Sequence, residues 1–200
     1  FVLGFGGTKA AFTRELLSHP EFGFVSLSER EELLKRQKQA ISGLPDDIKS
    51  SKEYYSWLKK RITQKSKDGF YKFYGYDEFV NRLFLVSNVD ITDLEIEAER
   101  SMRTDKPVTL DELIKHHISD GTIQINESFL RQFEGSLIIG DEIHNTYNMN
   151  MKNKRGVTIQ YVLDHVPNCK FVSLSATPIN NSPTEIIELA NYHLPVDQKI

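Results

Sequence analysis

Two short apolar runs, each followed at once by polar residues, constrain the fold of this chain most strongly. Ser136 to Ile139 (SLII) leads through Gly140 into Asp141 and Glu142, and Lys170 to Ser175 (KFVSLS) leads into Ala-Thr-Pro. Between them, Arg155 to Val166 has apolar residues at helical spacing. Strand, helix and strand in such close succession predict an α/β fold with a parallel sheet covered by helices.

The rest of the chain gives a coarser prediction. Phe1 to Phe5 has the composition of a buried strand, and Gly6-Gly7 forms a turn into a helix over Thr8 to Ser18. A capping box at Ser28-x-x-Glu31 predicts a further helix, which Gly43 closes, and Leu44 to Asp47 is predicted as a loop. The next predicted elements are a helix over Glu53 to Lys65, a strand over Phe70 to Tyr76 and a helix over Asp77 to Val86. Later in the chain, we predict a capped helix at Thr109 to Ile114 and a helix started by Asn181 to Glu185, with Ser182 as its cap. The weakly patterned section from about 87 to 127 could be an insertion.

Composition excludes several classes of protein. Two hundred residues with 39% hydrophobic content can bury a core, and the length predicts one large domain or one and a half. No apolar run approaches the roughly 18 residues of a membrane span. We therefore expect a soluble globular chain with no membrane partner and no signal peptide. The net charge of −3 gives no overall basic field, so nucleic-acid binding would need a local patch. The single Cys169 excludes an internal disulfide and fits a reducing compartment.

The polar residues after the two strands predict a ligand site. We expect the first strand to be central and buried on both faces, so that Asp141 and Glu142 lie at its carboxyl end, where open α/β sheets bind ligands. There Asp141 can hold Mg²⁺ through water, and Glu142 can orient or deprotonate a water that attacks a nucleoside triphosphate. His144 follows on the turn, within reach of hydroxyls at Ser175 and Thr177.

An isolated Asp-Glu pair is most often part of an exposed turn. Here the pair follows a buried strand, and a second strand ends in Ser-Ala-Thr-Pro, so a functional site is the better interpretation.

These segments resemble known motifs. IIGDEIHN resembles motif II of the DExH branch of superfamily-two helicases and translocases, with isoleucine in place of alanine at position 143, and LSATP resembles motif III. The flanking sequences FVLGFGGTKAAFTRELLSHPEFGF, YGYDEFVNRLF and LSATPINNSPTEIIELANY are similar to the D-x-x-H helicase-type transcription factors of large cytoplasmic DNA viruses. This group includes the poxvirus early transcription factor small subunit and its African swine fever virus counterpart.

The resemblance implies a RecA-like domain of P-loop NTPase type, the first of two, that binds ATP and grips a nucleic-acid strand. It assigns Mg²⁺ to Asp141, water activation to Glu142, coupling of hydrolysis to movement to His144, and relay of that coupling to Ser175 and Thr177. With the P-loop outside this chain, Asp141 and Glu142 are also its ATP-binding residues.

Two further segments become candidates for nucleic-acid contact. FVLGF-GG-TK resembles motif Ia, which makes Gly6, Thr8 and Lys9 candidates for phosphate contact, and a plain connecting turn stays open as the alternative. FYGYDEF occupies the place of another strand-contacting turn, so Tyr74, Gly75 and Tyr76 are weaker candidates. Aromatic core packing is the better expectation for at least one of these tyrosines.

No G-x-x-x-x-G-K-[ST] motif occurs in the chain. In the family this loop precedes motif Ia, so we expect residues 1–200 to be a partial first RecA-like domain, from motif Ia to just past motif III, with the N-terminal strands and the P-loop outside it. The second domain, which supplies the arginine finger, is also expected outside it. We predict that these residues alone do not hydrolyse ATP at a useful rate.

The implied function is an ATP-dependent helicase or translocase in viral early transcription, located in the virion and host cytoplasm. Its expected cofactors are ATP and Mg²⁺, and its expected partners are nucleic acid, DNA rather than RNA, a viral RNA polymerase and another transcription factor subunit. A translocase on double-stranded DNA without strand separation is also open. The alternative is a catalytically retired helicase fold that serves as a scaffold.

Two other clusters of residues are weaker candidates for functional sites. Lysines and arginine at 59, 60, 61, 65, 67 and 72 interleave with aromatic residues at 54, 55, 57, 70, 71 and 73, which suits phosphate contact and base stacking. A solvated helix face beside a partly buried aromatic cluster is the favoured interpretation. His116, His117 and Asp120 lack the spacing and the further ligand of a metal site.

Overall fold

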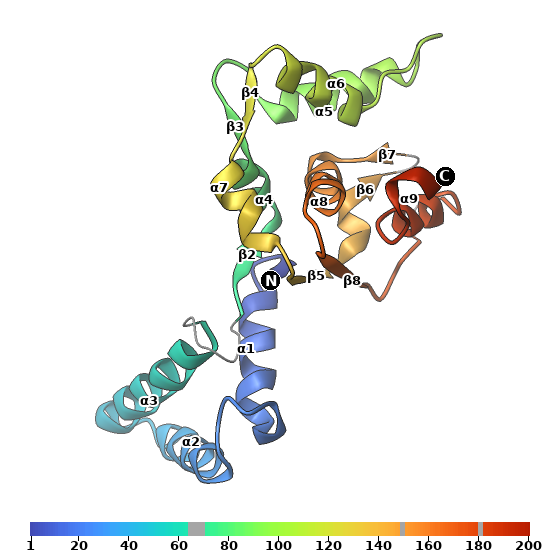
Figure 1. Cartoon of the computed structure of the whole chain (residues 1–200). Coiled ribbons are helices and arrows are strands. Elements are labelled where there is room, and N and C mark those ends of the chain that lie inside the picture. The colour runs from blue at the N-terminus through green and yellow to red at the C-terminus, as the bar shows by residue number, and fades with distance from the viewer. Residues whose placement is uncertain (64–70, 149–150, 180–181) are drawn as a thin grey trace. The chain divides into compact units, whose positions relative to one another are not determined.

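The computed structural model describes residues 1–63, 71–148, 151–179 and 182–200 (Figure 1). The chain folds as two compact units. We call residues 1–5 and 74–200 the sheet unit, and residues 6–73 the helical unit. Lys65, Lys67, Phe70 and Asn181, which entered the predictions, lie outside the described residues. No described helix is long and apolar enough to cross a membrane.

A four-stranded sheet forms the centre of the sheet unit. Its strands, in spatial order, are β2 (Phe73–Gly75), β1 (Val2–Gly4), β5 (Leu137–Asp141) and β8 (Lys170–Leu174). Strands β1, β5 and β8 run parallel, with Ile139 of β5 opposite both Val2 and Val172. The predicted parallel α/β sheet is therefore confirmed, with β5 in a central position, and the arrangement is consistent with a RecA-like fold.

One face of this sheet is packed against helices. Leu3 and Ile138 join a single core with residues of α4 (Tyr76–Leu83) and α8 (Lys154–His165). The opposite face carries Leu137, Val172 and Leu174, whose exposed fractions are 45%, 40% and 39%. The prediction that β5 is buried on both faces is wrong for this structure, because α4 and α8 pack on the face of Ile138.

Helix α4 is shorter than the sequence indicated. The prediction extended it to Val86, but it ends at Leu83, and Phe84–Val86 forms strand β3, which pairs antiparallel with β4 (Ile123–Ile125). Periodicity alone missed β3 because its partner strand lies about forty residues later in the chain.

The weakly patterned section folds as a helical hairpin carried by β3 and β4 (Figure 1). It consists of α5 (Ile91–Ser101) and α6 (Leu110–Ser119), which pack against each other. The predicted cap of α6 is confirmed: Thr109 accepts from the Glu112 amide, and the Glu112 carboxylate accepts from the Thr109 amide. Whether 87–127 is an insertion stays a prediction.

Shorter elements complete the sheet unit. They are α7 (Glu127–Leu130), the 3₁₀ turns η2 (Arg131–Phe133), η3 (Ile143–Thr146) and η4 (Val196–Gln198), the hairpin of β6 (Tyr147–Asn148) and β7 (Met151–Lys152), and α9 (Glu185–Asn191). The cap predicted for α9 is displaced, because Ser182 accepts from the Thr184 amide in a turn that precedes the helix.

The helical unit consists of α1 (Thr8–Ser18), η1 (Pro20–Phe22), α2 (Leu27–Ala40) and α3 (Pro45–Thr63). The bounds of α1 match the prediction. Its core is separate from that of the sheet unit and contains Leu16, Leu17, Val25, Leu33, Leu58 and Ile62. Two predictions are wrong here. The capping box is Ser26 with Glu29, two residues earlier than predicted, and Pro45 to Asp47 form the first turn of α3 instead of a loop.

Candidate functional site

The polar ends of β5 and β8 lie at the same edge of the sheet. Asp141, the last residue of β5, pairs with Leu174, the last residue of β8. Ser175 therefore leaves β8 beside the Asp141-Glu142 turn. This is the carboxyl edge of parallel strands, where α/β sheets bind ligands.

Glu142 occupies an unusual backbone conformation at this edge. Its φ of 54° and ψ of 45° place it in the left-handed region, where non-glycine residues are uncommon and cost free energy. The turn ends β5 abruptly and starts η3. The Glu142 side chain is 46% exposed, so its carboxylate is available to a ligand.

His144 connects the two strand ends. Its Nδ1 lies 2.8 Å from the Ser175 hydroxyl, 3.4 Å from the Thr177 hydroxyl and 3.3 Å from a Glu142 carboxylate oxygen. The Ser175 oxygen also accepts from the Thr177 amide at 3.1 Å. The contact predicted between His144 and the Ser-Ala-Thr segment is confirmed.

Asn145 fixes the tautomer of His144, and sequence reasoning missed it. The Asn145 amide nitrogen lies 3.0 Å from His144 Nε2 and also donates to the Glu142 carbonyl. In this orientation of the Asn145 amide its nitrogen donates to Nε2, an arrangement that places the ring proton on Nδ1. His144 Nδ1 therefore donates toward Ser175. The polar residue directly after the histidine was the available signal.

Two buried tyrosines hold the site from behind. Tyr76 donates to the Asp141 carbonyl at 2.7 Å, and burial raises the pKa of its hydroxyl, which keeps it protonated. Tyr147 donates to the Pro178 carbonyl at 2.7 Å, and burial raises its pKa to about 12. One tyrosine thus fixes the end of β5, and the other ties the segment after η3 to the Ser-Ala-Thr loop.

A close approach of α8 supports η3. Thr146 shares a hydrogen bond of 2.8 Å with the buried Tyr192 hydroxyl. A Cβ at Gly156 of α8 would overlap the Thr146 carbonyl and lie 2.6 Å from the Tyr192 hydroxyl. Only glycine fits here, and this requirement had no signal in the sequence pattern.

The donor set suits Mg²⁺ in one specific manner. Magnesium usually binds one or two carboxylates, keeps several waters and takes further oxygens from substrate phosphates. Asp141 and Glu142 provide adjacent carboxylates of this kind at the strand end. Within residues 1–63, 71–148, 151–179 and 182–200, no group of three or more His, Cys, Asp or Glu side chains forms an all-protein metal cage. The residues therefore fit a metal shared with a substrate.

The motif Ia candidates lie in the helical unit. Gly6 precedes α1, and a Cβ there would meet no atom within 4 Å. The Thr8 side chain is buried, whereas Lys9 is exposed and lies 5.9 Å from the Phe73 ring centre. Of the three, the Gly6 backbone and Lys9 are accessible to a phosphate. Their contact with nucleic acid stays a prediction.

The second candidate turn, Tyr74 to Tyr76, exposes fewer side chains to a nucleic acid than we expected. Tyr76 is 2% exposed and belongs to the core, so its side chain positions Asp141 and does not face solvent. Tyr74 is half-buried, with its ring against Phe79 and Phe129. Core packing, expected for at least one of these tyrosines, is confirmed. Gly75 is exposed, and its role stays a prediction.

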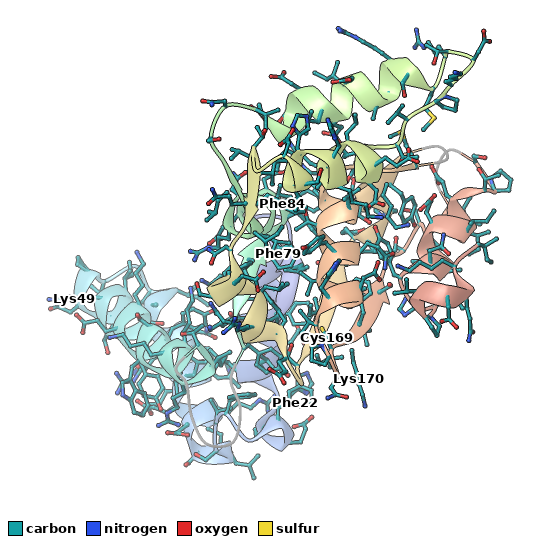
Figure 2. All side chains as sticks on the ribbon, turned by 45° about the horizontal axis from the view of Figure 1, so that its top comes forward. Phe22, Lys49, Phe79, Phe84, Cys169 and Lys170 are labelled. Carbon is teal, nitrogen blue, oxygen red and sulfur yellow. The ribbon has the colours of Figure 1, made fainter. Side chains whose placement is uncertain are left out.

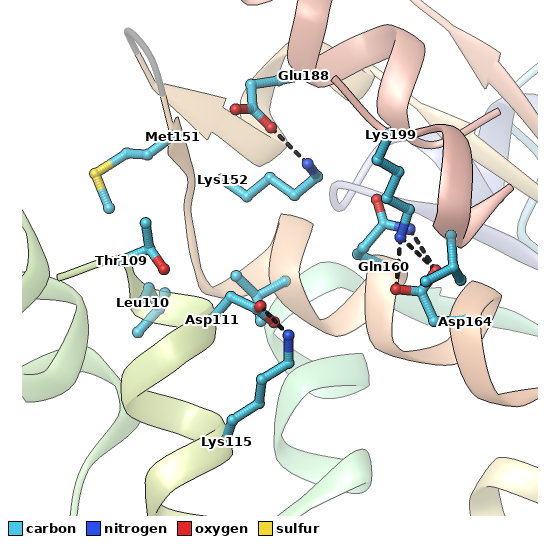
Figure 3. Close-up of a pocket in the computed structure, with 12 residues that line it drawn as sticks. Thr109, Leu110, Asp111, Lys115, Met151, Lys152, Gln160, Asp164, Glu188 and Lys199 are labelled. Atoms are coloured by element: carbon cyan, nitrogen blue, oxygen red, sulfur yellow. Dashed lines mark hydrogen bonds and ion pairs between the residues drawn. The ribbon is translucent and has the colours of Figure 1, made fainter. Parts of the chain in front are cut away.

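A cavity of about 400 Å³ lies elsewhere in the sheet unit, between α6, β7, α8 and α9 (Figure 3). Three ion pairs line it: Lys115 with Asp111, Lys152 with Glu188, and Lys199 with Asp164. Each lysine is neutralised by an acid of the same wall, so the cavity offers little net charge to a ligand.

The fold and the site together define an α/β protein with a parallel sheet, whose Asp-Glu-x-His turn contacts a Ser-Ala-Thr loop at the carboxyl edge. Among known proteins, the chain is similar to the early transcription factor large subunit homologue of African swine fever virus. The protein of a Kenyan pig isolate and that of a Namibian warthog isolate are each 36% identical to it over 210 aligned positions. That of a tick isolate from Malawi is 35% identical.

These alignments cover 98% of the chain but only 18–19% of the relatives. The chain thus spans about a fifth of the length of the curated relatives it matches. The viral resemblance is confirmed at this level, although the name differs from the small subunit expected from the poxvirus comparison. No family model matches the chain, and no solved structure matches it.

Proposed function

We propose that this chain is part of an ATP-dependent nucleic-acid helicase or translocase that acts in viral early transcription. The observation that carries the proposal is the hydrogen bond between His144 and Ser175 at the carboxyl edge of β5 and β8. It joins two acidic residues suited to nucleotide chemistry to the loop of the neighbouring strand. A change in conformation at the end of β5 would therefore alter the conformation at the end of β8.

The residues have separate roles in this proposal. Asp141 and Glu142 supply the carboxylates for Mg²⁺, which would neutralise charge on the ATP phosphates when bound. Glu142 accepts a proton from the attacking water, since its carboxylate is accessible. His144, held in one tautomer by Asn145, senses the position of Glu142 and passes it to Ser175. Thr177 completes the relay through its contacts with both residues.

The relatives are named early transcription factors, which supports a role in viral early transcription. We propose nucleic acid, DNA rather than RNA, a viral RNA polymerase and another transcription factor subunit as its partners, and the virion and host cytoplasm as its location. The same name, transcription factor, also favours the alternative of a scaffold that binds nucleic acid or polymerase without hydrolysing ATP. Intact chemistry at Asp141, Glu142 and His144 favours the enzyme.

ATP hydrolysis by the longest natural form of the protein tests the proposal, measured with and without single- and double-stranded DNA and RNA. We expect stimulation by one nucleic acid, and a fall in kcat of about 10²- to 10⁴-fold in Glu142→Gln, because the general base is lost. Glu134→Gln, an exposed acid just before β5, is the matched control and should retain activity. Activity that is absent in the parent protein, or equal in both variants, would favour the scaffold.

Ser175→Ala tests the relay separately. It removes the acceptor of the His144 proton while leaving Asp141 and Glu142 in place. We expect basal hydrolysis to stay within a few-fold of the parent, while stimulation by nucleic acid is lost. Equal loss of basal and stimulated activity would place Ser175 in the chemical step instead.

A further inference from the structure

Charge is divided unequally between the two units. The helical unit contains fourteen lysines and arginines against nine acidic residues, whereas the rest of the chain contains eleven against nineteen. The overall charge of −3 therefore conceals a basic helical unit and an acidic sheet unit. A basic unit attracts polyanions even when the whole chain does not.

Helix α3 concentrates exposed lysines on its outer face. Ser51, Leu58 and Ile62 point into the core of the helical unit. Lys49, Lys52 and Lys60 lie on the opposite side and are exposed, and we call these three residues the α3 lysine stripe. Figure 2 shows Lys49 projecting from the outer surface of the unit. At 1.5 Å per residue, the stripe extends about 16 Å along the helix.

The stripe differs from two arginines of the same unit, which are already paired. Arg61 makes two hydrogen bonds to the Glu29 carboxylate, and Arg36 donates to Glu32 and Ser50. Within the described part of the chain, no ion pair engages a lysine of the stripe. Asp46 and Glu53, also exposed, are acidic residues on this side of α3. The three lysines thus present positive charge to solvent, whereas Arg36 and Arg61 make contacts within the unit.

The aromatic residues beside the stripe are not free platforms. Trp57 is 48% exposed, but its ring already stacks with Tyr54 and carries the Arg61 guanidinium 4.2 Å from its centre. The partly buried aromatic cluster expected from the sequence is confirmed for Tyr54, Tyr55, Tyr71 and Phe73. A partner of this face would therefore meet lysine ammonium groups, with base stacking playing no part.

We propose that the α3 lysine stripe is a binding surface for the phosphodiester backbone of nucleic acid, separate from the strand-end site. Successive phosphates of one DNA strand are about 3.4 Å apart along the axis, so a stripe of this length spans several of them. A basic helix face is a typical electrostatic footprint of nucleic-acid binding, whereas lysine is depleted from protein interfaces. The stripe therefore fits nucleic acid better than an acidic protein.

This inference goes beyond the proposed motor and does not depend on ATP hydrolysis. Contact through phosphates carries no sequence information, so binding should be independent of sequence and strongly weakened by salt. The stripe would keep a strand near the protein in any nucleotide state of the strand-end site.

Fluorescence anisotropy with labelled mixed-sequence DNA, single-stranded and duplex, tests the proposal on the 200-residue chain across a series of salt concentrations. The variant Lys49→Gln/Lys52→Gln/Lys60→Gln should bind at least tenfold more weakly at low salt, with a salt dependence shallower by about three in the log-log slope. The matched control, Lys38→Gln/Lys106→Gln/Lys170→Gln, removes the same charge from three exposed lysines elsewhere. It should bind within about twofold of the parent.

Several outcomes would overturn the proposal. They are equal weakening in the two triple variants, no DNA binding by the parent chain, and competition by polyglutamate as effective as competition by DNA at equal charge. Circular dichroism of both variants excludes loss of folding. DNA binding is measured without ATP, so a failure of the proposed ATPase would leave this result unaffected.

Glu53→Gln provides a test in the opposite direction. Removing the Glu53 carboxylate, which lies between Lys52 and Lys60 in α3, should tighten DNA binding about two- to threefold, because it repels phosphates. Unchanged or weaker binding would show that the DNA does not lie along α3. Glu31→Gln on α2 serves as the control, with the same change of charge at an exposed position of another helix.

Discussion

The two units of this protein use polar residues in opposite ways. In the sheet unit, a network of hydrogen bonds joins residues far apart in sequence, such as Tyr76 with Asp141 and His144 with Ser175. In the helical unit, Arg61 and Glu29 tie neighbouring helices together, and no ion pair among the described residues engages Lys49, Lys52 or Lys60. The sheet unit thus places polar side chains together at the ends of its strands, whereas the helical unit presents lysines on an exposed helix face.

Each unit also has its own core, and substitutions in the two cores should act separately. Phe79 is fully buried in the sheet unit (Figure 2), and Leu58 is fully buried in the helical unit. Phe79→Ala should cost about 3–5 kcal/mol and Leu58→Ala about 2–5 kcal/mol, since each removes buried atoms and leaves a cavity. Hydrogen exchange measured by segment should rise mainly over residues 137–141 in the first variant and over 45–63 in the second.

The conservative variants Phe79→Leu and Leu58→Met keep most of the buried volume and should show much smaller changes. A rise of similar size in both segments for either alanine variant would mean that the two units unfold as one. The two units would then differ in their surface residues but not in their stability.

Gly156→Ala should have the next largest effect and should act on the sheet unit alone. The new methyl group would overlap the Thr146 carbonyl and crowd the Tyr192 hydroxyl, both of which are buried. Backbone atoms cannot move aside as the end of a flexible side chain can. We therefore expect the free energy of unfolding to fall by about 2–3 kcal/mol, despite the higher helix propensity of alanine. Chemical denaturation measures it. Gly6→Ala, where a Cβ has no neighbour within 4 Å, is the control. Equal stability of the two variants would show that α8 does not pack closely on η3.

The same contrast explains how far the sequence could predict the fold. Helix α1 has the predicted bounds, and β5 and β8 are the predicted neighbours, because their patterns are local. The capping box was placed two residues late because both Ser26 and Ser28 have glutamate three positions later. Strand β3 was missed because its pairing with β4 is a long-range contact.

The site was predicted to a similar extent. The link from His144 to Ser175 followed from two motifs at the ends of adjacent parallel strands. The bond from Tyr76 to Asp141 spans 65 residues of sequence and depends on how α4 packs, which no local pattern encodes. Tyr76 was therefore assigned to a possible surface contact, although it is a positioning residue.

Tyr76→Phe tests that positioning role and should cost about 1–2 kcal/mol. The substitution removes one hydroxyl and leaves the Asp141 carbonyl without this donor, while the ring stays packed. Tyr161→Phe is the matched control, since Tyr161 is half-buried in the same core and should change stability little. Denaturant unfolding compares the two. If Tyr76→Phe also lowers ATP hydrolysis by the longest natural form, the Asp141 turn depends on this bond; a stability equal to the control would remove Tyr76 from the site.

The smallest effect concerns the polar link of the helical unit and depends on pH. Hydrogen bonds from Arg61 lower the pKa of the Glu29 carboxyl from 4.5 to about 2. A carboxyl whose pKa is lower in the folded state stabilises the fold above its unfolded pKa, and this stabilisation disappears as pH falls from 4.5 toward about 2. Because Arg61 and Glu29 are partly exposed, we expect Glu29→Gln to cost only about 1 kcal/mol at pH 7.

At pH 2 the parent and Glu29→Gln should approach equal stability, since the carboxyl is then protonated in the unfolded state and about half protonated in the folded state of the parent. Glu31→Gln, an exposed acid on the same helix, controls for the loss of one negative charge. Urea unfolding of the three proteins between pH 7 and pH 2, followed at the Trp57 fluorescence, measures the difference. A loss in Glu29→Gln that persists unchanged at pH 2 would mean that Glu29 acts by capping α2 through Ser26 and not through its charge, because a glutamine cap is less effective at every pH. The Ser26–Glu29 capping box would then account for the contribution of Glu29 to the helical unit.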